Sequence, residues 1–408
     1  MEDSALKDFS WPITTLLYDD YEALRTCLDH FSSTIRDKQL IVFGAGIRGS
    51  LFAVLLKEFG YTDLLFVDNN EQKWGGVIHG HPIVAPTELP KYRKNAVVLI
   101  ATEAYHSIAE QLTKLGFSRD QDFLVIETDH YGSYIDEMLR DCTPTTLILG
   151  DCGLSHISLF DKNKDNLSIM LKNKLGSDKT KVLAMHGMGM RSFYHVIKTQ
   201  VEHNPSITNL FITINFGVFT GKRHLLPRTQ HVGLLERVYN ISNQKDEEFL
   251  DYLKIAQGRA SSFKLDFFSE TQDRSVSTHL SRNRLSLFFQ VNYMYKIRKN
   301  TEDMEYLSRI INYAAKHKIK VIPFIPPVNY EFAETLLGNK FKEKYNTILG
   351  TFTEWMSEEN TPVLDMSYLL QASQFGTAET IDETINYDGR QKVLEALMAY
   401  TANHGVVK

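Results

Sequence analysis

Gly150, Asp151 and Cys152 have the types and the spacing of an acyl-transfer nucleophile. They close the apolar run TLILG, which reads as a buried strand, and open a new segment. A side chain on a sharp turn at the carboxyl end of a parallel strand is exposed above the sheet, close to the N-terminal amides of the next helix. Such a helix end lowers the pKa of a thiol. Cys152 is therefore a candidate nucleophile.

The same three residues resemble the first motif of the SGNH, or GDSL-type, hydrolases and acyltransferases, in which Gly-Asp-Ser carries the catalytic serine. Cys152 stands in the serine position. The resemblance extends over about residues 145–400 and includes the later segments IPPVN and VLDMS. It implies a flavodoxin-like α/β/α fold and a site for acyl transfer or ester hydrolysis.

The resemblance also implies an oxyanion site. Either Gly187 or Gly189, in the run KVLAMHGMGM, resembles the glycine whose backbone N–H enters that site, and Asn215 resembles the asparagine whose amide completes it. Negative charge develops on the carbonyl oxygen during attack, and loss of one donor costs on the order of 3 kcal/mol.

The last motif departs from the family pattern DxxHxN. Thr384 or Ile385 stands where the family has its general-base histidine, and Asp382 is the nearest acid. Neither Thr nor Ile can accept a proton at neutral pH, although a cysteine needs a base less because a few per cent of a thiol is already thiolate. The change has two interpretations: a degenerate scaffold that binds carbohydrate, or an active site whose base comes from elsewhere.

Two histidines are candidates for that base. His156 lies four residues after Cys152, and a continuing helix would place both on one face, one turn apart. His186 ends the adjacent strand beside the oxyanion glycines. The alternative for each histidine is a satisfied or solvated side chain, and Cys152 can equally be an ordinary buried thiol.

A glycine-rich loop in the first half predicts nucleotide binding. Gly44, Gly46, Arg48 and Gly49 lie between the strand-like run LIVF and a helical stretch, and Asp68 closes the next strand. The first glycine permits a tight turn, the second lets a pyrophosphate approach the backbone, and the third permits close packing of helix and strand. The carboxylate of Asp68 could accept hydrogen bonds from a ribose. The alternative is a tight turn without a ligand.

The run FVDNNEQKWGGVIHGHPIVAPTEL, with VVLIATEAYHSIAEQLTKLGF after it, resembles the N-terminal nucleotide-sugar-binding domain of bacterial sugar O-acyltransferases and related proteins of surface-polysaccharide synthesis. The resemblance covers about 90 residues and implies a nucleotide-sugar or, as the alternative, NAD above Gly44–Gly49. Hydride transfer is less favoured because the predicted domain lacks the second half of a dehydrogenase fold.

A basic cluster follows Asn215 and could hold a phosphate or a sugar carboxylate, with a solvated loop as the alternative. Downstream, the run SRNRLSLFFQVNYMYKIRKN adds aromatic rings that could stack on sugars or form core. The cluster consists of Lys222, Arg223, His224, Arg228 and His231.

Strand-like apolar runs alternate with helical stretches along the chain and carry these residues at their ends. This alternation predicts an α/β protein with parallel sheets. We expect a helical arm at 1–37, a Rossmann-like domain at 38–128, a linker helix at 129–144 and an SGNH-like domain at 145–408. An insertion at about 217–300 is expected to form a lid or a substrate wall.

Composition and charge exclude several classes of protein. The net charge of −5 gives no basic field for nucleic acid. No apolar run reaches the length of a membrane span, and the acidic N-terminal segment is unlike a signal peptide, so we expect a cytoplasmic protein without a transmembrane segment. The three cysteines lack CxxC spacing, so neither a disulfide framework nor a metal site is predicted.

The expected function is modification of a capsule or lipopolysaccharide precursor by acyl transfer or ester hydrolysis, with Cys152 as nucleophile. The partner would be a small sugar or glycan, and homo-oligomerisation is left open. The first alternative is a non-catalytic carbohydrate-binding or nucleotide-sugar-binding protein of polysaccharide assembly. The second is an NAD-dependent oxidoreductase.

Overall fold

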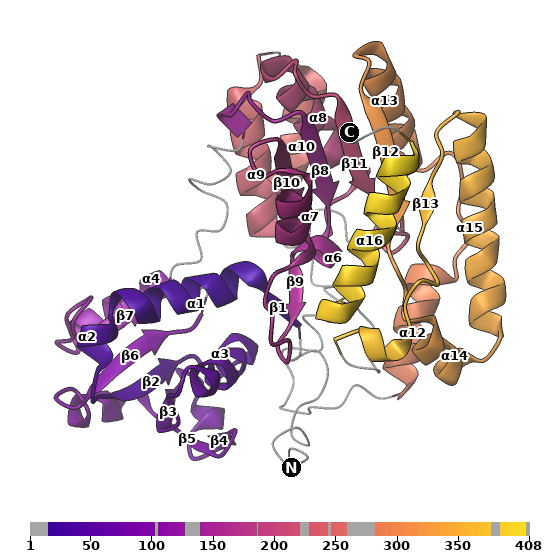
Figure 1. Cartoon of the computed structure of the whole chain (residues 1–408). Coiled ribbons are helices and arrows are strands. Elements are labelled where there is room, and N and C mark those ends of the chain that lie inside the picture. Colours follow the sequence, from indigo (N-terminus) through magenta and orange to yellow (C-terminus); the bar gives the residue numbers. More distant parts are fainter. Residues whose placement is uncertain are drawn as a thin grey trace. The chain divides into compact units, whose positions relative to one another are not determined.

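The computed structural model describes residues 15–102, 105–126, 139–185, 187–220, 228–243, 246–258, 282–376 and 384–404. The chain divides into two compact units, Met1–Asp129 and His130–Lys408. Each contains a parallel sheet and helices, so the predicted α/β class is confirmed (Figure 1). Most of the predicted linker helix lies outside the described residues.

The first unit has a six-stranded sheet in which only the β4–β5 pair is antiparallel. Its central strands are apolar and buried along nearly their whole length, because helices of a wound sheet cover both faces. The winding direction reverses between β2 and β6, which flank each other. The strand order is β4 (Val77–Ile78), β5 (His81–Val84), β3 (Leu64–Val67), β2 (Gln39–Phe43), β6 (Ala96–Ile100) and β7 (Phe123–Val125).

The helices of this unit include the predicted N-terminal arm. Its helix begins at Tyr18 after a short strand, and residues 1–14 lie outside the described part. The ion pair between Arg48 and Asp20, with 2.9 Å between Nη2 and Oδ1, ties the arm to the helix of the glycine loop. The elements are β1 (Thr15–Leu17), α1 (Tyr18–His30), α2 (Ser32–Ile35), α3 (Ile47–Glu58), η2 (Glu71–Lys73), η3 (Pro86–Lys91) and α4 (Tyr105–Lys114).

The second unit has a five-stranded, wholly parallel sheet. Each strand lies in one of the five apolar runs that the sequence offers here, TLILG, KVLAMHG, NLFITIN, IKVIPFIPP and TPVLDMS. The winding direction reverses between β8 and β11. All five residues of β8 are buried, which explains its unbroken apolar pattern. The strand order is β10 (Thr180–Ala184), β8 (Thr146–Gly150), β11 (Asn209–Thr213), β12 (Lys320–Ile325) and β13 (Leu364–Asp365).

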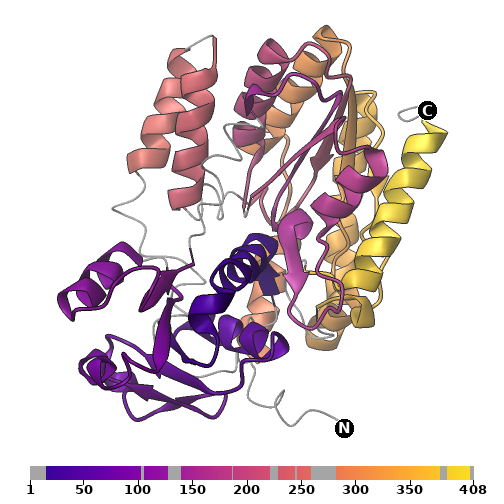
Figure 2. The same cartoon turned by 60° about the vertical axis from the view of Figure 1, so that its left-hand side comes forward.

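Helices cover both faces of this sheet (Figures 1 and 2). On one face, Ile148 of β8 and Phe211 of β11 share a core with Leu171 of α7 and Leu397 of α16. The helices and the remaining strand are α6 (Cys152–Ser155), β9 (His156–Ser158), α7 (Leu167–Leu175), α8 (Met190–His203), α9 (Arg228–Ile241), α10 (Glu247–Gly258), α12 (Arg282–Tyr293), α13 (Glu302–Lys316), α14 (Tyr330–Leu337), α15 (Lys340–Glu358), η4 (Ala372–Gln374) and α16 (Tyr387–Asn403).

The described part of the insertion belongs to the body of the fold. Helix α10 packs on α8, where the hydroxyls of Tyr252 and Ser192 lie 2.8 Å apart. The aromatic rings of α12, Phe288, Phe289 and Tyr293, are buried against one another and against α14 and α15. Of the two alternatives for these rings, sugar stacking and core, the structure supports core, because packing against α14 and α15 removes them from solvent.

His195 of α8 is a buried polar residue whose ring lacks hydrogen bonds within the described residues. Its ring stacks on Phe249 of α10 at a centroid distance of 4.1 Å. Within the described residues, neither ring nitrogen has a hydrogen-bond partner. Burial lowers the pKa of His195 to about 3, so the ring is neutral at physiological pH.

Replacing His195 by Phe should stabilise the protein by about 1 kcal/mol at pH 7, because it removes two unsatisfied buried nitrogens and keeps the ring contacts. Between about pH 6.5 and pH 3, the unfolded chain takes up a proton that the folded chain does not, so the wild type loses stability as pH falls. The advantage of the variant should widen over that window. Melting temperatures at pH 7, 5.5 and 4 measure it, with the exposed His404→Phe as control. A pH-independent difference would contradict this account.

Candidate functional site

The predicted nucleophile and amide meet at the carboxyl edge of the second sheet. Asp151 and Cys152 form the turn between β8 and α6, and Asn215 follows the end of β11. The two strands are neighbours in parallel register, with Leu149 opposite Ile212. In doubly wound sheets, ligands bind outside the carboxyl ends of strands where the winding direction reverses, which is this position.

Hydrogen bonds hold Asp151 and Asn215 in fixed orientations. The Nδ2 of Asn215 donates to Oδ2 of Asp151, and its Oδ1 accepts the N–H of Gly217 at 2.8 Å. The other oxygen of Asp151 accepts the N–H of Gly153 at 3.1 Å and so caps α6. An amide nitrogen carries two N–H groups, so Asn215 can serve one further acceptor.

Close packing explains the glycine of this motif. A Cβ at Gly150 would lie 2.2 Å from Cδ1 of Leu154 and 2.8 Å from Oγ1 of Thr213. A larger residue would have to displace the side chains of Leu154 and Thr213, which are buried, so the turn from β8 into α6 favours glycine.

Cys152 is buried, whereas the sequence predicted an exposed thiol. Its exposed fraction is 3 %, because neighbouring side chains cover the turn. A cavity of about 590 Å³ lies between α7 and α16, and one of about 270 Å³ lies along α4 and η3; Cys152 lines neither. A substrate can therefore reach the sulfur only when the side chains that cover it move.

The segment that leads to the predicted oxyanion glycines starts beside this turn, since the N–H of Met185 donates to the carbonyl of Gly150 at 3.1 Å. Gly187 has a φ of 64°, which favours glycine, and Gly189 is the N-cap of α8. The next amide of α8, at Met190, donates to Oδ1 of Asp303 at 3.0 Å. Burial raises the pKa of Asp303 to about 6. Which glycine would donate to a substrate stays a prediction.

The structure corrects the expected place of His156. Helix α6 ends at Ser155, and His156 has extended backbone angles and begins β9, so it does not share a helix face with Cys152. A one-turn helix cannot carry an i, i+4 pair on its surface. Two contacts remain: the backbone N–H of His156 donates to the carbonyl of Cys152, and its Nδ1 lies 3.3 Å from Oγ1 of Thr384.

The roles of several predicted site residues stay predictions, because the structure does not describe these residues or their side chains. Arg228 begins α9, but its side chain and that of His231 are not described. Those wholly outside the described residues are His186, Lys222, Arg223, His224 and Asp382.

In the first unit, the fold accounts for two of the three loop glycines. Gly44 has a φ of 118°, and a Cβ at Gly49 would lie 1.8 Å from the carbonyl oxygen of Gly44. A Cβ at Gly46, the N-cap of α3, would meet no other atom within 4 Å. Among the described residues, no contact requires glycine at position 46, and the space beside it is open.

The two charged residues predicted to bind a ligand at this loop, Asp68 and Arg48, already have partners in the first unit. Asp68 accepts the N–H of Ala45 at 2.8 Å and pairs with Lys73 at 2.9 Å. Arg48 pairs with Asp20, and its guanidinium lies over the ring of Phe52. A ribose at Asp68 would have to share that carboxylate with the loop itself.

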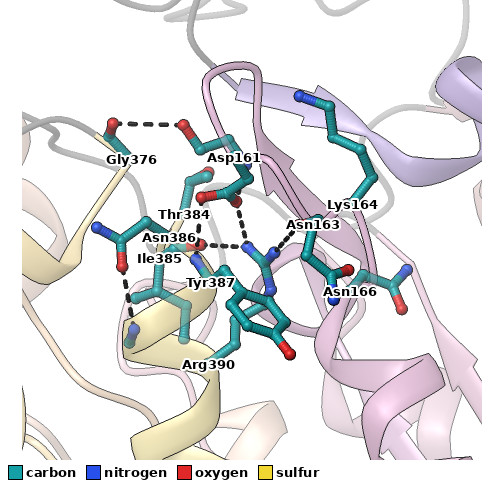
Figure 3. Close-up of polar contacts among 12 residues, drawn as sticks. Asp161, Asn163, Lys164, Asn166, Gly376, Thr384, Ile385, Asn386, Tyr387 and Arg390 are labelled. Atoms are coloured by element: carbon teal, nitrogen blue, oxygen red, sulfur yellow. Dashed lines mark hydrogen bonds and ion pairs between the residues drawn. The ribbon is translucent and has the colours of Figure 1, made fainter.

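A buried arginine of the second unit, Arg390, was not among the residues that the sequence pointed to. Arg390 of α16 is fully buried and donates to Oδ2 of Asp161 at 2.8 Å and to the carbonyls of Ile385 at 2.7 Å and Asp165 at 2.9 Å (Figure 3). Asp161 also accepts the N–H of Tyr387 at 3.0 Å. No local pattern could have found it, because Asp161 lies 229 positions away along the chain.

Two further properties concern metals and membranes. Across the described ranges, no three His, Cys, Asp or Glu side chains gather where they could hold a metal ion. Over the same ranges, no helix is both long enough and apolar enough to span a membrane.

Comparison with known proteins adds a similarity over the first sheet. A family model described as C2185-like, N-terminal, matches residues 36–123. No curated protein matches the chain. A solved structure titled "The structure of a putative platelet activating factor from Streptococcus pneumonia" aligns at 13% identity and a TM-score of 0.33, over 72% of this chain and 98% of that chain. A score this low supports no argument. The chain is thus similar to C2185-like N-terminal domains over residues 36–123.

Proposed function

We propose that the chain modifies a sugar-containing precursor of a surface polysaccharide by acyl transfer or ester hydrolysis. The observation that carries the proposal is the meeting of Asp151, Cys152 and Asn215 where the winding of the second sheet reverses. Its strand order, 2-1-3-4-5 along the unit, is flavodoxin-like and supports an SGNH-like domain.

In the proposed reaction, a histidine, His156 or His186, takes the proton of the Cys152 thiol while the sulfur forms a bond to the acyl carbon. The bond from that carbon to the ester oxygen then breaks, and the leaving oxygen takes the same proton from the histidine and departs as an alcohol. The amide of Asn215 and the N–H of Gly187 or Gly189 stabilise the transient oxyanion. Water or a sugar hydroxyl then attacks the thioester and releases the thiol. Asp151 positions Asn215 and caps α6.

We further propose that the first unit is a Rossmann-like module that holds a nucleotide-sugar above Gly44–Gly49. Its parallel strands follow the order 3-2-1-4-5, and the glycine loop lies at the reversal between β2 and β6. The open space at Gly46 supports a ligand there. Calorimetry with a uridine diphosphate sugar tests this, and binding of NAD in its place would favour an oxidoreductase.

Gly46→Ala should weaken nucleotide-sugar binding by about tenfold or more while the fold persists, because a methyl group there points into the space left for the ligand. The loss of a glycine N-cap should cost no more than about 1 kcal/mol of stability. Gly49→Ala is the contrast: its Cβ would strike Gly44, so the melting temperature should fall. Calorimetry and thermal unfolding measure both. Wild-type affinity in Gly46→Ala would reject the site.

The burial of Cys152 favours a second candidate, a carbohydrate-binding protein without catalysis. Hydrolysis of p-nitrophenyl acetate and of acetylated sugars separates the two. Turnover that iodoacetamide abolishes supports the enzyme. Glycan binding with no turnover supports the binding protein.

A further inference from the structure

We propose that His156 is the general base of this site and that Thr384 is a positioning residue that orients its ring. The inference rests on the proposed acyl-transfer function and deepens it. Thr384 is one of the two residues that stand where the resembling family has its base, so the histidine has moved from the C-terminal segment to β9. Three observations lead to this assignment.

First, the backbone holds His156 close to the nucleophile. Cys152 is the first residue of α6, and the N–H of His156 donates to the Cys152 carbonyl after a single turn. This hydrogen bond keeps the backbones of the two residues close together, although their side chains do not share a helix face. Both residues are buried, so water competes little for the ring.

Second, Thr384 contacts Nδ1 of His156, which is the ring nitrogen that a residue must bind to orient the ring with Nε2 as its base. Its Oγ1 lies 3.3 Å from Nδ1 of His156, although the two residues are 228 positions apart in the chain. When this hydroxyl accepts the Nδ1 hydrogen, the lone pair resides on Nε2, which is then the basic nitrogen. A carboxylate partner does the same in serine-dependent triads and also stabilises the imidazolium.

A neutral partner suits a thiol. Thr384 carries no charge, so it stabilises the protonated ring less than a carboxylate would. A serine would need that stabilisation, but a thiol gives up its proton more easily. This chain has a cysteine where the resembling family has a serine, and a hydroxyl where that family has an orienting carboxylate. The two changes are chemically consistent with each other.

Third, the buried ion pair of Asp161 and Arg390 is hydrogen-bonded both to β9 and to the segment that contains Thr384. Oδ2 of Asp161 accepts the N–H of Ser158, the last residue of β9, at 3.2 Å, and it pairs with Arg390 at 2.8 Å. Arg390 donates in turn to the carbonyl of Ile385, next to Thr384, at 2.7 Å. Figure 3 shows Arg390 between Asp161 and the segment of Thr384 and Ile385. The strand that carries the histidine and the segment that carries the threonine thus share one anchor.

The test combines three substitutions with two readouts. Thr384→Val keeps the shape and removes the hydroxyl, Thr384→Ser restores it, and His156→Gln removes the base. The control is Thr401→Val, at a buried threonine of α16 whose hydroxyl bonds only within its helix among the described residues. The readouts are kcat and KM on an acetylated sugar, and the ring ¹⁵N shifts of His156, assigned by their loss in His156→Gln.

Thr384→Val should lower kcat by on the order of tenfold to a hundredfold with KM nearly unchanged, and Thr384→Ser should recover most of it. The ¹⁵N shifts should change from one tautomer to a mixture in Thr384→Val alone. Thr401→Val should leave kcat and shifts at wild-type values. Unchanged kcat and shifts in Thr384→Val, or turnover that survives His156→Gln, would overturn the roles assigned to His156 and Thr384. Either result would leave the proposed acyl-transfer function standing. A wild type without turnover would reject the proposed function and the base with it.

Discussion

Cys152→Ala is expected to lower esterase or acyltransferase turnover by at least about a thousandfold, because no thioester can form without the sulfur. The loss should appear in kcat, since the residues proposed to bind the sugar and the acyl oxygen are untouched. Replacing one buried sulfur by hydrogen leaves a small cavity, so the fold should persist at a cost of about 1 kcal/mol. Steady-state kinetics and thermal unfolding on the same preparations separate lost chemistry from lost structure.

The two other cysteines provide matched controls. Cys142 is exposed, and its Sγ lies 3.1 Å from the carbonyl of His203. Cys27 is buried in the first unit, and burial raises its pKa to about 11, so it remains a thiol at neutral pH. Cys142→Ala and Cys27→Ala should keep wild-type turnover. Activity that persists in Cys152→Ala, or disappears equally in Cys142→Ala, would end the case for Cys152 as nucleophile.

Arg390→Met is expected to lower the free energy of unfolding of the second unit by about 3–5 kcal/mol. The substitution removes a guanidinium with no exposed surface and leaves the Asp161 carboxylate buried without its charged partner. Three backbone carbonyls, those of Ile385, Asp165 and Asn163, also lose a donor. Urea unfolding measures the loss, with the fluorescence of the buried Trp355 reporting on this unit.

Two comparisons identify the cause of that loss. Arg309→Met breaks the ion pair with Glu248, whose side chains are 31% and 40% exposed, and should cost no more than about 1 kcal/mol. The double variant Asp161→Asn with Arg390→Met should recover part of the stability, because it no longer buries a lone charge. Equal losses in Arg390→Met and Arg309→Met would show that burial of the pair is not what matters.

The long buried strands and the two motif loops could be predicted from the sequence, whereas short strands such as β9 could not. Continuous apolar runs such as those of β2, β6 and β8 reflect burial on both faces, which is a local property of each segment. Gly44 and Gly49 are likewise determined locally, by a positive φ and by a contact five residues away. Parallel pairing then brings Asp151 and Asn215 to one edge without further information.

Only the tertiary structure decided how the site is covered and completed. A turn that follows a strand end is open or buried according to what packs over it, so the exposure of Cys152 could not be inferred from its neighbours. The same holds for the aromatic rings of α12, whose spacing suits a core as well as a surface. The contacts of Thr384 with His156 and of Arg390 with Asp161 join residues more than 220 positions apart. Periodicity and spacing describe neighbours along the chain, whereas such pairs exist only because packed layers bring distant segments together.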